Sequence, residues 1–149
     1  MGSSNAYWLI PDHVVFVHNV GDLNGADFRE VDGQIIALLN EAASKHSEKV
    51  HIFIDSTELT KLPNVLELEG GRILKYLREA NTGWSIVVGH KNNVFLKVIS
   101  RLLTSMTKSD LYVADDLAKG ASFIRQIAPD LDVPNVQEWK TYILSEKTG

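Results

Sequence analysis

The sequence predicts an α/β domain in which helices pack on a mixed, mostly parallel sheet of four or five strands. Two apolar runs precede the first helical pattern and predict an N-terminal β-hairpin. After this hairpin, strand patterns and helical patterns alternate, which favours parallel strands joined by right-handed crossovers. The third observation is the apolar run Val50–Asp55, which is typical of a buried strand. A chain of 149 residues fits one compact domain, 1–149.

The hairpin and the first helix follow directly from local sequence patterns. Tyr7–Ile10 and Val14–Val20 are short apolar strands joined by a proline-containing turn. Over residues 26–44, apolar residues recur at helical spacing. Asn24 or Asp27 is expected to cap this helix, because both residue types accept hydrogen bonds from free backbone N–H groups.

The later elements continue the alternation. In chain order we expect strand Val50–Asp55, a helix over 66–77 interrupted by Gly70-Gly71, strand Trp84–Gly89, helix Val94–Met106, strand Leu111–Ala114, helix Leu117–Ala128 and a terminal helix over about 135–145. The helix 94–106 is apolar over most of its circumference, which predicts burial against the sheet or a place at an interface. The terminal helix follows the alternating core of about 7–128 as an additional element.

Composition excludes several classes of protein. The net charge of −4 argues against general nucleic-acid binding, which usually needs a clustered basic face. The chain has no cysteine, so disulfides, thiol catalysis and cysteine–zinc sites are excluded. No segment reaches the ~18–20 apolar residues of a transmembrane helix, and the N-terminus lacks the pattern of a signal peptide. We therefore expect a cytoplasmic protein without a transmembrane segment.

Four segments together resemble the STAS domain, and most closely its SpoIIAA-like branch. They are Val20–Phe28 after the hairpin, the strand segment Ile52–Ser56, the strand Gly83–Gly89, and the closing strand–helix unit Leu111–Ala121. The resemblance covers about residues 7–128 and leaves the terminal helix unexplained. It implies a non-enzymatic module that binds another protein or, in some members, a nucleotide or lipid.

The sequence departs from this family at its phosphorylation site. In the anti-sigma-factor antagonists of the family, the modified serine lies in an Asp-Ser-Ser-Gly-like motif at the start of the second helix. Here the corresponding region, 59–65, reads Leu-Thr-Lys-Leu-Pro-Asn-Val and lacks the motif. Phosphoregulation is therefore not carried over, and Ser56, Thr57 and Thr60 are only candidate hydroxyls.

Polar side chains follow several predicted strands. The segments 22–25, 55–58, 90–93 and 115–116 are expected to converge, because the carboxyl ends of parallel strands share one edge of the sheet. The start of the helix after Gly89 also offers free N–H groups to a phosphate. The ordinary interpretation is capping and turn formation. The ligand-binding candidates are Asp55, Ser56, Thr57, His90, Lys91, Asn92 and Asp115.

The case for an enzyme or a metal site is weak. No phosphate-binding loop, dinucleotide fingerprint or serine-hydrolase elbow occurs. The histidines make no recognisable metal motif, so neither a metal nor a cofactor is predicted. A hydrolase-like site would require Asp55 and His90, with Asp115 nearby, to lie within about 3 Å or one bridging water of each other.

The function predicted from these observations is that of a non-enzymatic, cytoplasmic regulatory or scaffolding module that binds another protein. The first alternative is a protein that binds a small molecule or lipid, in an apolar pocket under helix 94–106 or in the polar crevice. The hydrolase-like enzyme is the weaker alternative. Phe95, Ile99, Trp139 and Ile143 are interface candidates, and a projecting terminal helix would favour a homodimer.

Overall fold

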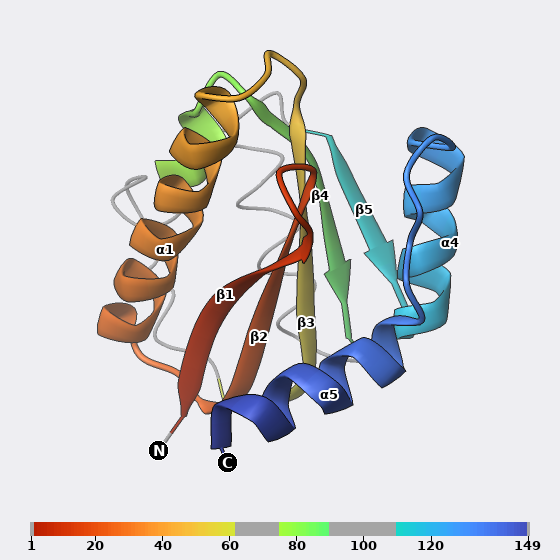
Figure 1. The fold of residues 1–149 in the computed structure, drawn as a ribbon. Coiled ribbons are helices and arrows are strands. Elements are labelled where there is room, and N and C mark those ends of the chain that lie inside the picture. The colour runs from red at the N-terminus through yellow and green to blue at the C-terminus, as the bar shows by residue number, and fades with distance from the viewer. Residues whose placement is uncertain (1, 62–74, 90–109, 149) are drawn as a thin grey trace.

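The computed structural model describes residues 2–61, 75–89 and 110–148 (Figure 1). Within these ranges the elements are β1 (Ser3–Ile10), β2 (Val14–Asp22), α1 (Gly25–Ala43), β3 (Val50–Lys61), the 3-10 helix η2 (Lys75–Arg78), β4 (Thr82–Val88), β5 (Leu111–Ala114), α4 (Leu117–Ile127) and α5 (Val136–Thr148). The predicted helix 94–106, and most of the one predicted over 66–77, lie outside the described residues.

The strands form one sheet in the order β1-β2-β3-β4-β5. β1 pairs with β2 antiparallel, whereas β2–β3, β3–β4 and β4–β5 are parallel. The predicted mixed, mostly parallel sheet with an N-terminal hairpin is therefore confirmed. The hairpin turn contains Asp12 at a positive φ of 67°, a conformation that Asp tolerates better than most residues.

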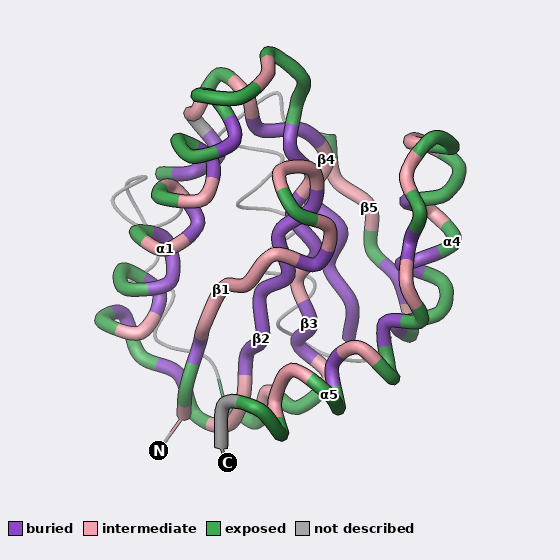
Figure 2. Tube along the Cα trace, viewed as in Figure 1, coloured by how far each residue is buried: buried purple, intermediate pink, exposed green. Residues whose placement is uncertain are grey.

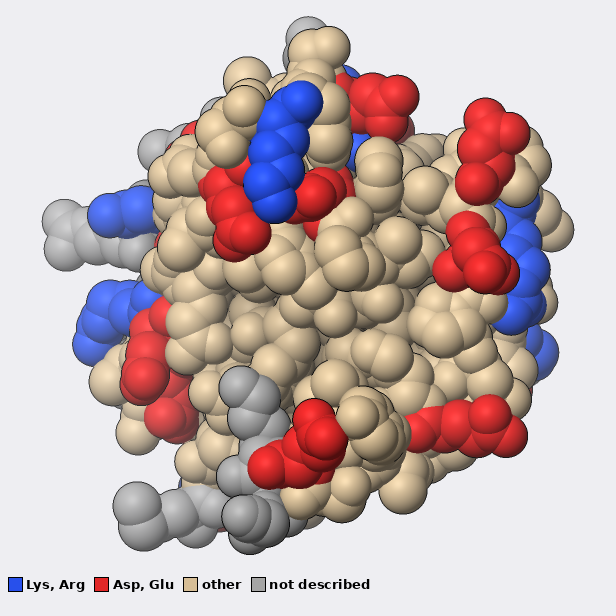
Figure 3. Space-filling model, viewed as in Figure 1, with Lys and Arg blue, Asp and Glu red and all other residues tan. Residues whose placement is uncertain are grey.

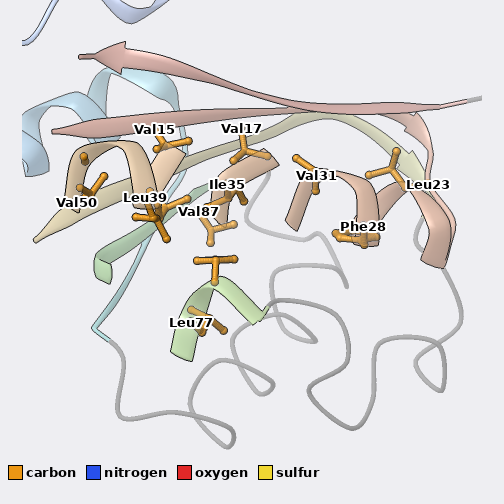
Figure 4. Packing of buried hydrophobic residues seen from close by; sticks show 13 residues of the cluster. Val15, Val17, Leu23, Phe28, Val31, Ile35, Leu39, Val50, Leu77 and Val87 are labelled. Atoms are coloured by element: carbon orange, nitrogen blue, oxygen red, sulfur yellow. The ribbon is translucent and has the colours of Figure 1, made fainter. Parts of the chain in front are cut away.

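Helices cover both faces of the sheet (Figure 1). Side chains alternate along β2, so that Val15 and Val17 join the core under α1, while Val14 and Phe16 join the core under α4 and α5. Figure 4 shows the first of these cores, between the sheet, α1 and η2. The central strands are buried along most of their length, and the outer sides of the helices are exposed (Figure 2).

Helix α1 begins with a capping box, and both predicted capping residues take part. Asp27 N donates to Asn24 Oδ1 at 2.9 Å, and Asn24 N donates to Asp27 Oδ2 at 2.9 Å. Two otherwise free N–H groups are thereby satisfied.

Strand β3 is longer than the sequence pattern predicts. It continues to Lys61, so Asp55, Ser56 and Thr57 lie inside the strand and not after its end. The reason is tertiary: β2 keeps pairing with β3 past a bulge, with Val20 opposite Glu58. The described part of β4 ends at Val88, which pairs with Asp55. Asp55 therefore lies level with the carboxyl end of β4, as expected, while its own strand extends beyond it.

Candidate functional site

Four ionisable side chains meet where α5 lies against the carboxyl-terminal half of β2 and β3 (Figure 1). His18 comes from β2, Asp55 and Glu58 come from β3, and Lys140 comes from α5. We refer to these four residues as the charge cluster. Asp55 and Glu58 are three residues apart, and the bulge beside β2 brings both to the same lysine.

Asp55 is the most buried member of the charge cluster, with no exposed surface. Its Oδ1 accepts hydrogen bonds from Thr57 N at 3.0 Å and from Thr57 Oγ1 at 2.6 Å. Its Oδ2 lies 2.7 Å from Lys140 Nζ. This contact is a close ion pair between two buried groups. Both oxygens of Asp55 are thus engaged within the protein.

Lys140 joins the two acids. Its Nζ lies 2.7 Å from Glu58 Oε2 as well as 2.7 Å from Asp55, and its side chain is only 10% exposed. Burial by itself would lower the pKa of Lys140, but the hydrogen bonds that Lys140 donates to the Asp55 and Glu58 carboxylates, together with the attraction of their negative charges, outweigh burial and raise it. Lys140 is therefore a cation at neutral pH, and its charge balances part of the acidic pair.

Glu58 connects the lysine to the histidine. His18 Nε2 lies 2.6 Å from the same Glu58 Oε2 that contacts Lys140. The hydrogen bonds from Lys140 and His18 lower the pKa of Glu58. Because the Glu58 side chain is 48% exposed, its charge is partly screened by solvent. The ion pair between Asp55 and Lys140 is therefore the least screened, and the strongest, in the charge cluster.

The donor atoms of His18, Asp55 and Glu58 all lie within 4.8 Å of one another, as the ligands of a metal ion would. The Lys140 ammonium approaches two of these atoms at 2.7 Å. A divalent cation would have to displace it. In the structure described, the ammonium group of Lys140 thus lies between the carboxylates that would otherwise be available to a metal ion.

Apolar contacts beside the charge cluster fix the position of Lys140. Trp139 packs edge-to-face on Phe16, with ring centroids 4.8 Å apart. Val136 is 3% exposed and belongs to the core under α4 and α5. Since Val136 and Lys140 are one helical turn apart, the same face of α5 carries the apolar anchors and the lysine.

Ser56 takes part in a separate polar network on the other face of the sheet. It is fully buried and accepts a hydrogen bond from Asn19 Nδ2 at 3.2 Å. Asn19 Oδ1 in turn accepts from Ser4 Oγ at 2.5 Å. Ser56 is therefore directed away from the Asp55 side chain, and its hydroxyl is not accessible to a modifying enzyme in this fold.

The other candidates from the sequence are dispersed. Thr60 is exposed and donates to Asp22 Oδ1 at 2.6 Å, whereas Asp115 pairs with Lys119 at 3.1 Å on the first turn of α4. Ile143 is half-buried on α5. The candidates that lie outside the described residues are His90, Lys91, Asn92, Phe95 and Ile99.

Sequence reasoning named Asp55, Thr57 and Trp139 as candidates and placed Glu58 in the polar segment 55–58 without making it a candidate, and it did not select His18 or Lys140. The signal for Lys140 was available, because it lies between apolar residues Trp139 and Ile143 on a helix whose apolar side was recognised. The contact of Glu58 with it depends on the bulge and the extension of β3, which no local pattern predicts.

A shallow hollow lies beside α4 and the first turn of α5. Its volume is about 290 Å³, slightly below the usual range of about 300–1,000 Å³ for ligand pockets. Its lining residues are Leu117, Ala118, Ala121, Ser122, Arg125, Asn135, Val136 and Gln137. The hollow is separate from the charge cluster.

Comparison with known proteins gives one informative result. No protein-family model and no curated protein matches the sequence. Among solved structures, the chain is similar to an uncharacterised protein of the DUF3478 family from Shewanella loihica PV-4, described as having a SpoIIAA-like fold. The two share 18% identity with a TM-score of 0.51, over 82% of this chain and 92% of the other.

Among the described residues, no helix has the length and apolar character needed to cross a membrane. The similarity to the solved structure shows the fold of this chain, and it confirms the fold resemblance seen in the sequence. This chain has the SpoIIAA-like fold of the STAS type.

Proposed function

We propose that this protein is a non-enzymatic, cytoplasmic regulatory or scaffolding module that acts by binding another protein. The SpoIIAA-like fold supports this class of function by analogy. The observation that carries the proposal is a side of the molecule on which charged groups are few and apolar groups are partly accessible.

Charged side chains lie mainly around the rim of the face shown in Figure 3, and uncharged residues cover its centre. On the α4 and α5 side of the sheet, several large apolar residues are only half-buried where they pack on the core: Tyr7, Ile10, Leu131 and Trp139. Protein interfaces combine a centre depleted of charge and enriched in aromatic residues with a polar rim. This distribution fits a binding surface.

The state of Asp55 also supports binding over catalysis. A general base must come within hydrogen-bond reach of the proton that it removes. Asp55 is fully buried, and its two oxygens are engaged by Thr57 and Lys140. A role in holding the fold together explains this arrangement without a substrate.

In-cell photo-crosslinking tests the proposal. A photoreactive phenylalanine analogue would replace Ile10, and a matched variant would carry it at the exposed position Glu30 on α1. We expect the full-length chain, expressed in its native cells, to form a discrete heavier adduct with another protein from Ile10 and not from Glu30. Equal adducts from both positions, or none from Ile10, would contradict the proposal.

A further inference from the structure

We propose that the hollow between α4 and the first turn of α5 binds a small carboxylic acid, whose carboxylate pairs with Arg125 while its apolar part covers the floor of the hollow. The floor is the set of apolar lining residues, Leu117, Ala118, Ala121 and Val136. Among the described lining residues there is no member of the charge cluster, and neither of the crosslinking positions Ile10 and Glu30. This ligand site is therefore independent of the proposed protein-binding role.

The hollow runs along one stripe of α4. Leu117, Ala121 and Arg125 follow one another at i, i+4 and i+8, so their side chains lie in one row along the helix. Ala118 and Ser122 form the neighbouring row, and the start of α5 supplies the remaining lining residues. The alanine side chains end at Cβ and leave space between the two helices. The resulting volume of about 290 Å³ suits a ligand that is smaller than a drug molecule or a lipid.

Arg125 gives the hollow a positive charge that the protein does not neutralise. It is the one charged residue in the described lining, and among the described residues it forms no ion pair with an acid. Its Nη2 donates to Val133 O at 3.4 Å, which is a long hydrogen bond, and a guanidinium carries five N–H donors in all. The bond to Val133 holds the side chain beside the hollow, while its other N–H groups remain available to an anion.

The combination of one cation with an apolar floor selects among anions. A guanidinium binds a carboxylate through two parallel N–H···O bonds. An acid with a short hydrocarbon part would at the same time remove the apolar floor from water, which is favourable in proportion to the area covered. A free phosphate would leave that floor in water, and it carries more negative charge than the single arginine of the lining can balance. The lining therefore fits a monocarboxylic acid better than a phosphate.

The uncharged polar side chains of the lining are compatible with a carboxylate. They are Ser122, Asn135 and Gln137, and each carries an N–H or O–H donor. Asn135 Oδ1 accepts a hydrogen bond from Glu138 N at 3.1 Å, so the oxygen of this amide is used within the protein and its Nδ2 group is left to donate. The described lining thus offers donors beside the cation and contains no carboxylate that would repel the ligand.

Arg125 also has an ordinary structural role, because it lies in the last turn of α4, where a cation interacts favourably with the helix dipole. That role requires a positive charge near the end of the helix and no ligand. The two roles differ in a measurable way, because only a ligand site discriminates between an acid and its neutral amide and is blocked when the hollow is filled.

The test compares two probes of equal size on the full-length wild-type chain, isovalerate and its neutral amide isovaleramide. Binding is followed by the NMR shifts of the backbone amides of the lining residues. We expect saturable shifts with isovalerate, which should bind at least about tenfold more tightly than isovaleramide because of its charge-assisted hydrogen bonds to Arg125. Acetate lacks the hydrocarbon part, and each buried methylene contributes about fourfold in affinity. Acetate and inorganic phosphate should therefore both bind at least about tenfold more weakly than isovalerate.

Three variants separate the charge from the shape of the hollow, and circular dichroism checks that each is folded. Arg125→Gln should abolish the preference for isovalerate over isovaleramide. Ala118→Leu fills the hollow and leaves Arg125 in place, and it should weaken isovalerate binding at least about tenfold; position 118 is exposed, so the larger side chain does not disturb the core. Lys119→Gln is the matched control, because it removes the same charge from an exposed position of α4 outside the lining. It should bind isovalerate within about twofold of the wild type.

Several results would overturn the proposal. They are equal binding of isovalerate and isovaleramide, phosphate or acetate binding as tightly as isovalerate, no saturable shift at the lining below a concentration on the order of 10 mM, or wild-type affinity in Arg125→Gln or Ala118→Leu. If Arg125→Gln does not fold, the wild-type comparison and Ala118→Leu decide the outcome. The Ile10 crosslink measures protein binding separately, so failure of this ligand site would leave the proposed function standing.

Discussion

At the scale of single residues, solvent exposure decides how much each acid of the charge cluster contributes to the stability of the fold. Asp55 has no contact with solvent, whereas the Glu58 side chain is 48% exposed. A buried charge that loses its partner cannot be compensated by water, whereas an exposed one can. The two acids contact the same lysine at the same distance, yet the loss of the buried Asp55 should destabilise the protein more than the loss of Glu58.

We predict that Asp55→Asn lowers the free energy of unfolding by about 3–5 kcal/mol, because Lys140 loses its buried counterion. Glu58→Gln should cost about 1 kcal/mol or less, since solvent screens that pair. Urea denaturation of both variants checks this order. Equal losses in the two variants would show that burial does not determine how much each acid contributes to stability.

The lowered pKa of His51 makes the free energy of unfolding depend on pH in a known direction. Burial lowers the pKa of His51 below its usual value of 6.5, and His51 Nδ1 accepts a hydrogen bond from Trp84 N at 3.0 Å. The unfolded chain therefore takes up a proton at higher pH than the folded chain does. The stability contributed by neutral His51 is complete above about pH 6.5 and is lost as the pH falls through the lowered folded-state value.

We expect the free energy of unfolding of the wild-type chain to fall between pH 7 and pH 5.5, and to fall less in a His51→Gln variant. Urea unfolding at several pH values measures both. A variant with the same pH slope as the wild type would assign the dependence to other groups.

At the scale of elements, the packing of α4 on the sheet depends on a close approach at Gly120. A Cβ at this position would lie 2.7 Å from Phe53 Cε2 and 3.1 Å from Val88 Cγ2. Phe53 is fully buried, so its ring cannot move aside easily. Gly33 in α1 is the matched contrast, because a Cβ there meets nothing within 4 Å.

Gly33→Ala should therefore stabilise the protein by about 1 kcal/mol, the difference in helix propensity between the two residues. Gly120→Ala should destabilise it despite the same gain in propensity, because overpacking typically costs about 1–3 kcal/mol. Thermal unfolding of the two variants tests this. Stabilisation by Gly120→Ala would mean that α4 is less tightly packed than described.

The sequence is sufficient to predict elements that have a clear period or a capping residue. The hairpin, α1 with Asn24 and Asp27, and β5 followed by α4 were all recognised in this way. The length of β3 was not, because its continuation to Lys61 depends on pairing with β2 past a bulge. The charge cluster was missed for a related reason: it joins residues from positions 18 to 140, and no local pattern encodes that distance.

At the scale of the whole molecule, α5 packs against the parallel strands β2 and β3 of the sheet. Phe16, Asp55 and Glu58 come from those strands, and Trp139 and Lys140 from α5. The position of α5 thus depends on side chains from these two central strands. Our account is that the ion pair of Asp55 with Lys140 fastens this helix to the sheet.

A double-mutant cycle of Asp55→Asn and Lys140→Met tests this account most directly, with urea unfolding of the wild type, both single variants and the double variant. We predict that the double variant loses less stability than the two single losses combined, with a coupling energy of about 2 kcal/mol or more. Losses that add to within about 0.5 kcal/mol would contradict the account, because the two residues would then contribute independently.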